Sequence, residues 1–328
     1  MVKITHKFRQ GFNATGDQSQ ERGSIIVLVA LALTALLGFC AIVTDVGILY
    51  AKKVQLQNSV NAAALAGVQE LPSKPDLAKE KAEDYALQNG VPDVTVTFGA
   101  NNVKIIVTAT QQVPTYFARI WGITTNQISV SAKAMTIPVT GMKEGTVPLS
   151  IPSQVLNYGV TYNLKVGGGD GDNGWYGALD LGGKYEHDLT YGSTGTLSVG
   201  QLVNQDPGNM SMPSNRAIKY RIDEPDPRIP PNTIDDHDWN APRLLYIPIV
   251  LPNGSQEEIV GFAAFWIDSL VKGQGNASVI TGRFVRELAS KGYSNVSLSD
   301  LLKIEYNLEN GGVVGSDFGV YSAKLVKN

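Results

Sequence analysis

The chain has few of the side chains on which enzyme and metal sites depend. It has one cysteine, Cys40, which excludes a disulfide framework and a thiolate metal site within one chain. None of its three histidines belongs to an HExxH or a nucleophile-elbow GxSxG pattern. The net charge of -3 argues against nucleic acid as a partner, because neutralising phosphates requires clustered Lys and Arg.

A long stretch without charge lies near the N-terminus. Residues 23–44 contain no charged side chain and are almost wholly aliphatic. At about 1.5 Å of rise per residue, such a helix crosses a hydrocarbon core of roughly 30 Å. A cleavable signal peptide is the alternative, but it predicts a shorter apolar region followed directly by a small-residue cleavage site, whereas this run ends in Thr44-Asp45-Val46. We therefore expect an uncleaved transmembrane helix at residues 23–44.

The flanking charges predict how this helix is oriented. Residues 1–22 carry four Lys and Arg residues, whereas only Lys52 and Lys53 follow soon after the span. The more basic flank normally stays in the cytoplasm. We therefore expect a cytoplasmic tail at residues 1–22 and everything beyond Asp45 on the outer side of the membrane.

Helical periodicity continues past the expected span. Apolar and small residues recur at spacings of three and four as far as Gly67, which predicts one long helix. Its last part, NAAALAG at residues 61–67, carries small residues on one stripe, and such residues let another backbone approach closely. Two partners for this stripe are equally compatible with the pattern: a helix of another protein, or the chain's own outer domain.

The following segments predict a small α+β domain. Pro75 begins a helix, PDLAKEKAEDYALQN, which Gly90 closes. Two alternating segments, VTVTFG and VKIIVTA, are joined by residues 99–102, whose composition is typical of a hairpin. A short helix, PTYFARIWG, and a further strand around residues 128–134 come next. With the extended part of the long helix, these elements form a predicted domain at residues 45–138.

Residues 139–328 have a different character. Glycine and proline are frequent, candidate strands are short, and helical periodicity is scarce until near Asp300. Strands are expected in VPLSI, TYNLKV, GWYGALDL, RLLYIPIVL and EIVGFAAFWIDSLV, with a long exposed loop at residues 223–240. The expected fold class is therefore α+β: an N-terminal transmembrane helix extended outside the membrane, a small α+β domain, and a mostly β C-terminal domain.

Acidic segments of this last domain offer oxygen ligands for a metal. Asp170, Asp172, Asn173 and Asp180 are candidates for calcium, although the segment lacks the standard helical calcium-loop pattern and a flexible turn is favoured. A carboxylate and imidazole run at residues 235–238 is more typical of a solvated acidic loop than of a metal site. We expect no catalytic residue and no cofactor.

The segment from Arg22 to Gly67 resembles the N-terminal region of TadG-like proteins, members of the TadE/TadG family that serve assembly of the tight-adherence (Flp) pilus. The matching positions are Arg22, Gly23, Ser24, Asp45, Gly47, Tyr50, Leu56, Gln57, Ala62, Ala63, Ala64, Leu65, Ala66 and Gly67. Many relatives have an aspartate where this chain has Asn61.

The resemblance implies a non-catalytic protein, anchored by a single pass in the bacterial cytoplasmic membrane, that helps to build or anchor a pilus used in surface adherence. The implied partners are the lipid bilayer and other pilus-assembly proteins or pilins, with a homo-oligomer as a further alternative. A minor pilin (pseudopilin) is an alternative function, although Leu28 stands where type IV-like pilins, processed after a residue such as Gly23, carry a glutamate. A second alternative is a membrane-anchored glycan or cell-wall enzyme that uses paired carboxylates from Asp180, Glu186 and Asp188.

Overall fold

The computed structural model describes residues 18–166, 177–206, 210–272, 278–297, 300–301, 303–304 and 317–326. The chain divides into two compact units, and each unit is made of two segments. The first unit consists of Met1–Gln55 and Thr110–Ser129, and the second consists of Leu56–Ala109 and Val130–Asn328.

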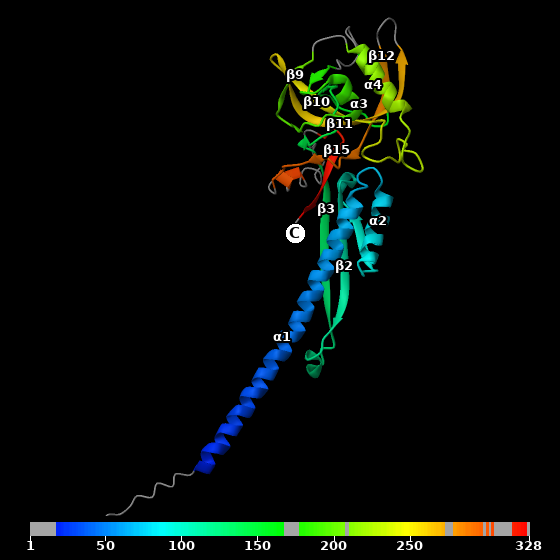
Figure 1. Cartoon of the computed structure of the whole chain (residues 1–328). Helices are drawn as coiled ribbons and strands as arrows, with labels where there is room; N and C mark the ends of the chain where they lie inside the picture. Colours follow the sequence, from blue (N-terminus) through cyan, green and yellow to red (C-terminus); the bar gives the residue numbers. More distant parts are fainter. Residues whose placement is uncertain are drawn as a thin grey trace, which may run out of the picture. The chain divides into compact units, whose positions relative to one another are not determined.

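The expected long helix is confirmed. Helix α1 (Gln18–Val68) runs without interruption for 51 residues, because the sequence contains no proline before Pro72 and keeps good helix formers along its length (Figure 1). Within the first unit, α1 leaves most of its aliphatic side chains exposed, from Ile25 to Val46. A helix that is apolar on every side and exposed to its surroundings is typical of a membrane span.

The expected hairpin and the strands around it form a five-stranded sheet. Its members, in spatial order, are β1 (Val94–Phe98), β2 (Lys104–Pro114), β3 (Thr125–Pro138), β15 (Val320–Val326) and β13 (Glu287–Leu288). Strands β1 and β2 are antiparallel, and the turn η1 (Ala100–Asn102) joins them with Asn101 at a φ of 56°. Asparagine tolerates this left-handed conformation better than most residues, which is why the polar turn sequence predicted the hairpin correctly.

The last strand of the chain completes this sheet. Strand β15 pairs antiparallel with β3, from Tyr321 opposite Pro138 to Val326 opposite Lys133. It also pairs in parallel with β13. The sheet therefore includes strands from both sides of residue 138, the expected domain boundary. The pairing gives β3 a hydrogen-bonding neighbour on its second edge, which a sheet ending at residue 138 would leave open.

The small-residue stripe of α1 packs inside its own unit. Ala63, Ala64 and Ala66 are buried, and a Cβ added at Gly67 would lie 2.5 Å from the Ile105 Cδ1 atom and 2.7 Å from the Ala78 carbonyl oxygen. Helix α2 (Pro75–Gln88) offers small residues in return, since its buried positions are all alanine. Of the two partners that the sequence allowed, the same chain is the one that covers the stripe, through α2 and β2.

A seven-stranded sheet dominates the C-terminal part, as expected for a mostly β region. Its main path, in order, is β5 (Ile151–Pro152), β10 (Leu244–Asn253), β11 (Gln256–Lys272), β12 (Ser278–Val285) and β6 (Thr161–Val166). Strand β9 (Leu202–Gln205) pairs with β11 and with β7 (Leu179–Asp180). A small third sheet joins β14 (Gly292–Tyr293), β4 (Gly141–Met142) and β8 (Leu197–Ser198).

Strand β10 forms most of the expected strand RLLYIPIVL, whose sequence is almost continuously apolar. Leu245, Ile247 and Ile249 belong to one buried cluster, whereas Leu244 and Tyr246 belong to another. Because alternate side chains point to opposite faces of a strand, both faces of β10 are covered.

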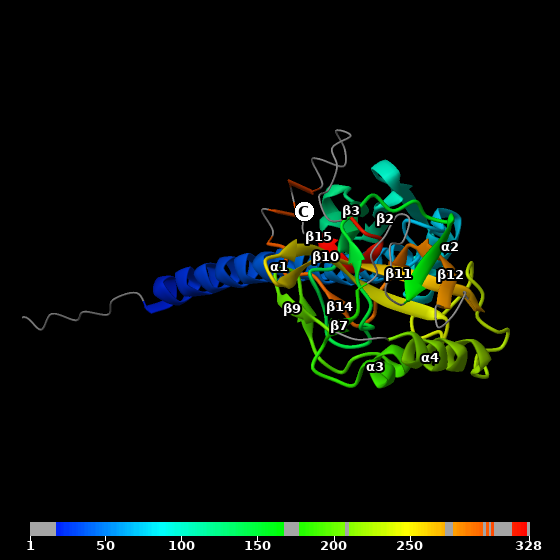
Figure 2. The ribbon, with the colours of Figure 1, turned by 90° about the horizontal axis from the view of Figure 1, so that it is seen from above.

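This mostly β region also contains helices that its weak helical periodicity did not predict. Two described helices, α3 (Tyr185–Tyr191) and α4 (Ser211–Asp223), pack against each other, and α4 also packs against β11 and β12 (Figure 2). The buried face of α4 is Ser211, Ser214, Ala217, Ile218 and Arg221. Only two of these residues are apolar, so the sequence carries little of the hydrophobic periodicity on which helix prediction depends. Within VPLSI, only the last residue belongs to a strand, β5.

Candidate functional site

Helix α1 is the one described helix that is long and apolar enough to cross a membrane. Its candidate segment, Ile25–Val68, contains a window of 18 residues with a mean hydropathy of 2.9, of which 6% is buried. The free thiol of Cys40 lies on this segment and is exposed. In the first unit, the exceptions to this exposure include Ala41 and Asp45, which are buried one helical turn apart on the same face.

The residues that bury Asp45 come from the loop between β2 and β3. We call residues 115–124 the hairpin tip. It is closed by a hydrogen bond from the Thr115 amide to the Thr124 carbonyl oxygen, at 3.1 Å, and by the Thr115 hydroxyl, which donates to the Ile123 carbonyl. The short helix expected here is the single 3₁₀ turn η2 (Ala118–Trp121), which ends at Gly122 with a φ of 81°.

The Asp45 carboxylate binds three successive backbone amides of the hairpin tip. The Tyr116 amide donates to Oδ1 at 2.9 Å, and the amides of Phe117 and Ala118 donate to Oδ2 at 3.0 and 2.7 Å. These amides are at the beginning of η2, where backbone N–H groups have no partner within the turn and where the peptide dipoles favour a negative charge. The aspartate thus caps a turn that lies more than 70 residues further along the chain, and joins the end of the apolar run to the hairpin tip.

The remaining motif positions lie along the same helix. Gly47 and Tyr50 are exposed, and Leu56 is buried. The Gln57 amide group donates to the Asn61 side-chain oxygen and to the Ser131 carbonyl oxygen, both at 3.0 Å. Asn61 accordingly serves as an acceptor within the second unit. Three motif positions, Arg22, Gly23 and Ser24, are helical, and the structure does not describe their side chains.

The N-terminal part of the chain, which contains these motif positions, matches a known family. Residues 23–70 match the Tad family, "Putative Flp pilus-assembly TadE/G-like". No curated protein and no solved structure matches the chain significantly. The Tad segment begins with the apolar run, includes Asp45, and ends just after the alanine stripe. It therefore contains both the candidate membrane span and the residues through which α1 contacts each unit.

The calcium candidates are only partly described. Asp170, Asp172 and Asn173 lie outside the described residues. Asp180 is exposed at the end of β7, and its carboxylate accepts a hydrogen bond from the Gly182 amide at 2.9 Å, as in a tight turn. No group of three or more His, Cys, Asp and Glu side chains in the described part of the chain is arranged to hold a metal ion.

The carboxylates considered for glycan hydrolysis have structural partners. Glu186 forms a two-point ion pair with Arg216, with the Arg216 Nε atom 2.7 Å from Glu186 Oε1. The hydrogen bond from Arg216 lowers the pKa of Glu186, so this carboxylate stays ionised, whereas a general acid needs a raised pKa. Asp188 is buried beside His187, whose Nδ1 atom lies 3.2 Å from its carboxylate.

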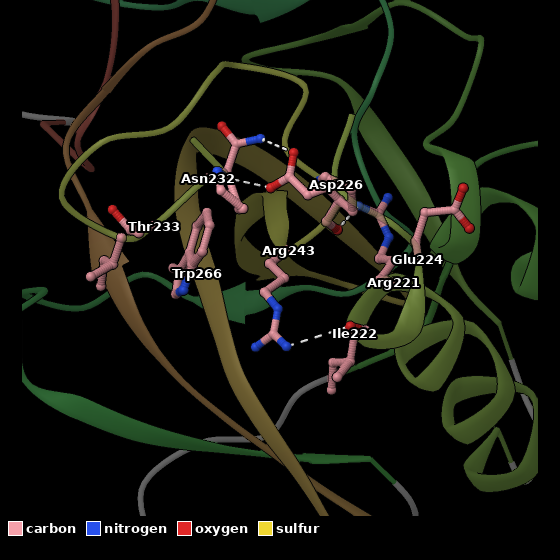
Figure 3. A pocket seen from close by; sticks show the side chains of 11 residues that line it. Arg221, Ile222, Glu224, Asp226, Asn232, Thr233, Arg243 and Trp266 are labelled. Atoms are coloured by element: carbon pink, nitrogen blue, oxygen red, sulfur yellow. Dashed lines mark hydrogen bonds between the residues drawn. The ribbon is translucent and has the colours of Figure 1, made fainter. Parts of the chain in front are cut away.

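A cavity of about 450 Å³ lies between the end of α4, the loop that follows it, and β11 (Figure 3). The Arg221 guanidinium is buried there and donates to the carbonyl oxygens of Leu189, Pro242 and Leu244. Burial lowers the pKa of Arg221 to about 10, and no carboxylate compensates its charge with an ion pair among the described residues. Backbone carbonyls therefore hold this cation, which ties α3 and α4 to the start of β10.

The polar groups around the cavity mainly hold its loop in place. Asp226 accepts hydrogen bonds from Asn232 (Figure 3). It also accepts a hydrogen bond from the Arg228 amide, and this bond is the largest of those that lower the pKa of Asp226. Arg243 donates to the Ile222 carbonyl oxygen at 3.4 Å. The loop is thus irregular, as the sequence predicts, but it is cross-linked by its own side chains.

His237 also has a structural partner rather than a metal cluster. Its Nε2 atom lies 3.1 Å from the Glu287 carboxylate, and its ring packs 5.1 Å from the Trp266 ring, centroid to centroid. Only 8% of its side chain is exposed. Burial lowers the pKa of His237, but the hydrogen bond and charge of Glu287 outweigh this effect, and the net shift is upward.

Proposed function

We propose that the chain is a single-pass, membrane-anchored and non-catalytic component of Tad/Flp pilus assembly or anchoring, with a role in surface adherence. The observation that carries this proposal is the Tad-matching segment at residues 23–70, which coincides with an exposed apolar helix of bilayer length. The basic tail is inside the cell, the span is in the cytoplasmic membrane, and the region beyond Asp45 is outside. The bilayer and other pilus-assembly proteins or pilins are its partners.

The side chains that would serve catalysis support a structural role. Glu186 is held ionised by Arg216, and His237 is occupied by Glu287. Packing residues of α1, such as Gly67, instead hold the end of the helix closely against other elements of the second unit.

Gene deletion with complementation tests the role in assembly. Cells without the gene are expected to lose surface pili and adherence, and the full chain supplied in trans should restore both. Unchanged pili in the deletion strain would overturn the proposal. Protease added outside intact or outer-membrane-permeabilised cells should remove the C-terminal region and leave residues 1–22 protected, which tests the orientation independently.

Intact-mass measurement of the membrane-extracted protein separates an anchor from a minor pilin. An assembly component should keep its N-terminal tail and stay with the membrane after carbonate washing. Loss of residues 1–23, together with recovery of the protein in sheared pili, would instead indicate a processed subunit of the fibre.

A further inference from the structure

We propose that the hairpin tip is a second membrane contact: its exposed aromatic and aliphatic side chains enter the interfacial layer of the bilayer that α1 spans. The inference rests on the proposed membrane anchoring and goes beyond it, because anchoring requires only the helix. All the residues it uses belong to the first unit, so their relative placement is that of one compact body.

The hairpin tip exposes an unusual number of large apolar side chains. The exposed fractions are 62% for Tyr116, 40% for Phe117, 79% for Ile120, 69% for Trp121 and 49% for Ile123. Turns that face water are built mainly from Gly, Pro, Asn, Asp and Ser. A contiguous exposed apolar patch instead marks a surface that contacts a partner or a membrane.

The position of Asp45 sets the depth of the hairpin tip. Asp45 is the first charged residue after the uncharged run at residues 23–44, so its carboxylate lies where a helix of bilayer length leaves the hydrocarbon. Its three hydrogen bonds, between 2.7 and 3.0 Å, hold the backbone of residues 116–118 against the same point of α1. The tip is therefore at the level of the lipid headgroups.

The exposed side chains of the hairpin change from polar on the strands to apolar at the tip, as a tip at the membrane surface requires. The strand residues before the tip form polar pairs, Thr110 with Ser129 and Gln112 with Gln127, and these side chains are exposed. Beyond them come tyrosine, phenylalanine and tryptophan, and Trp and Tyr are enriched where a membrane protein crosses from water to hydrocarbon. Arg119, exposed at the tip, adds a cation suited to lipid phosphates.

Lipid, rather than another protein, is the occupant that this geometry favours. The exposed tip is held against α1 at Asp45, and the aliphatic surface of α1 that precedes Asp45 is exposed from Ile25 to Val43. If that surface is immersed in lipid, the tip side chains meet the same lipid without any further partner. A second protein would have to displace lipid from the helix to reach the tip.

Spin-label accessibility in the full-length chain tests the inference. Three proteins with one cysteine each are reconstituted in vesicles of phosphatidylethanolamine and phosphatidylglycerol: the native chain, labelled at Cys40, and C40S chains carrying either Ile120→Cys or Gln111→Cys. Both new positions are exposed. Relaxation by oxygen, which concentrates in lipid, is compared with relaxation by a water-soluble nickel chelate present on both sides of the membrane.

The three labels separate the two proposals. The expected result is an oxygen-to-nickel accessibility ratio at residue 120 that is several-fold higher than at residue 111 and close to that at Cys40. If Cys40 is lipid-exposed but residue 120 matches residue 111, or is shielded from both reagents by protein, the hairpin-tip inference is overturned and anchoring stands. If Cys40 itself is accessible to nickel, the membrane span fails and both proposals fall.

Discussion

A carboxylate at the end of an apolar run needs partners for its charge, and Asp45 takes them from the backbone of a distant turn. The three amides at residues 116–118 would otherwise lack acceptors at the start of η2. Because hydrogen bonds to a charged group are stronger than neutral ones, this one side chain holds residues 116–118, near the start of the hairpin tip, in place. The resemblance singled out Asp45, but its partners are main-chain atoms, which no side-chain pattern in the sequence identifies.

Replacing Asp45 should release the start of the hairpin tip. In Asp45→Ala, the amides of residues 116–118 lose their acceptor, and the loss of three charge-assisted hydrogen bonds should loosen the start of the tip. Amide hydrogen exchange at these residues should then accelerate on the order of tenfold or more. Asp45→Asn keeps one oxygen acceptor and should show a smaller change. Unaltered exchange in Asp45→Ala would show that the carboxylate does not hold the tip.

The His237–Glu287 pair should make stability depend on pH. The pKa of His237 in the folded protein is raised above its ordinary value of 6.5. A group with a raised pKa stabilises the folded state fully below the unfolded pKa, and this stabilisation disappears as the pH rises through the folded pKa. Wild type should therefore exceed Glu287→Gln in unfolding free energy by more at pH 5.5 than at pH 8.5. Thermal unfolding of both proteins across this range would show it; a constant difference would contradict the pairing of charged groups.

At the scale of elements, the small-residue stripe of α1 lets the backbone of α2 lie close to the helix. Gly67→Ala would place a Cβ against the Ala78 carbonyl oxygen, which is backbone and cannot rotate away. We expect a loss of about 1–3 kcal/mol in unfolding free energy, the usual cost of overpacking. Urea unfolding of the detergent-solubilised protein measures it.

A matched control is available on the same helix. A Cβ added at Gly47 meets no atom within 4 Å, so Gly47→Ala should be neutral or stabilising by up to about 1 kcal/mol through helix propensity. Equal losses in both variants would mean that a general effect of replacing glycine in α1, and not contact at residue 67, sets the cost.

The same elements show what the sequence can predict. Local patterns in the sequence predict three of these elements. Unbroken apolarity predicts the long helix, polar turn residues predict the β1–β2 hairpin, and an apolar run predicts the long strand β11. Helix α4 does not, because its buried face is made largely of serine, alanine and an arginine that binds carbonyl oxygens. The hairpin tip was expected only as a short helix, since a local pattern cannot show that Asp45 binds it.

At the scale of the whole molecule, the order of strands in space differs from their order in the chain. Strand β15, almost at the C-terminus, lies between β3 and β13 in the first sheet. Its side chains also join separate cores, because Val320 belongs to the cluster around β10 and β11, whereas Val326 packs with Met135 and Ile137. Pairing between segments so far apart in sequence is invisible to local periodicity. We therefore expect the second unit to unfold as one cooperative body across residue 138.

Removing β15 should therefore weaken strands that precede it by almost two hundred residues. A chain ending at residue 316 loses the hydrogen-bonding neighbour of residues 133–138 and the buried side chains of Val320, Tyr321 and Val326. Each such side chain contributes about 1.5–3 kcal/mol when fully buried, so the sum is comparable with the total stability of a domain. We expect the shorter chain to unfold at a lower urea concentration than wild type and its β3 amides to exchange faster. A chain ending at residue 326 keeps the whole strand and should match wild type. If the shorter chain unfolded at the wild-type urea concentration, residues 45–138 would form a domain that does not depend on the C-terminal strand.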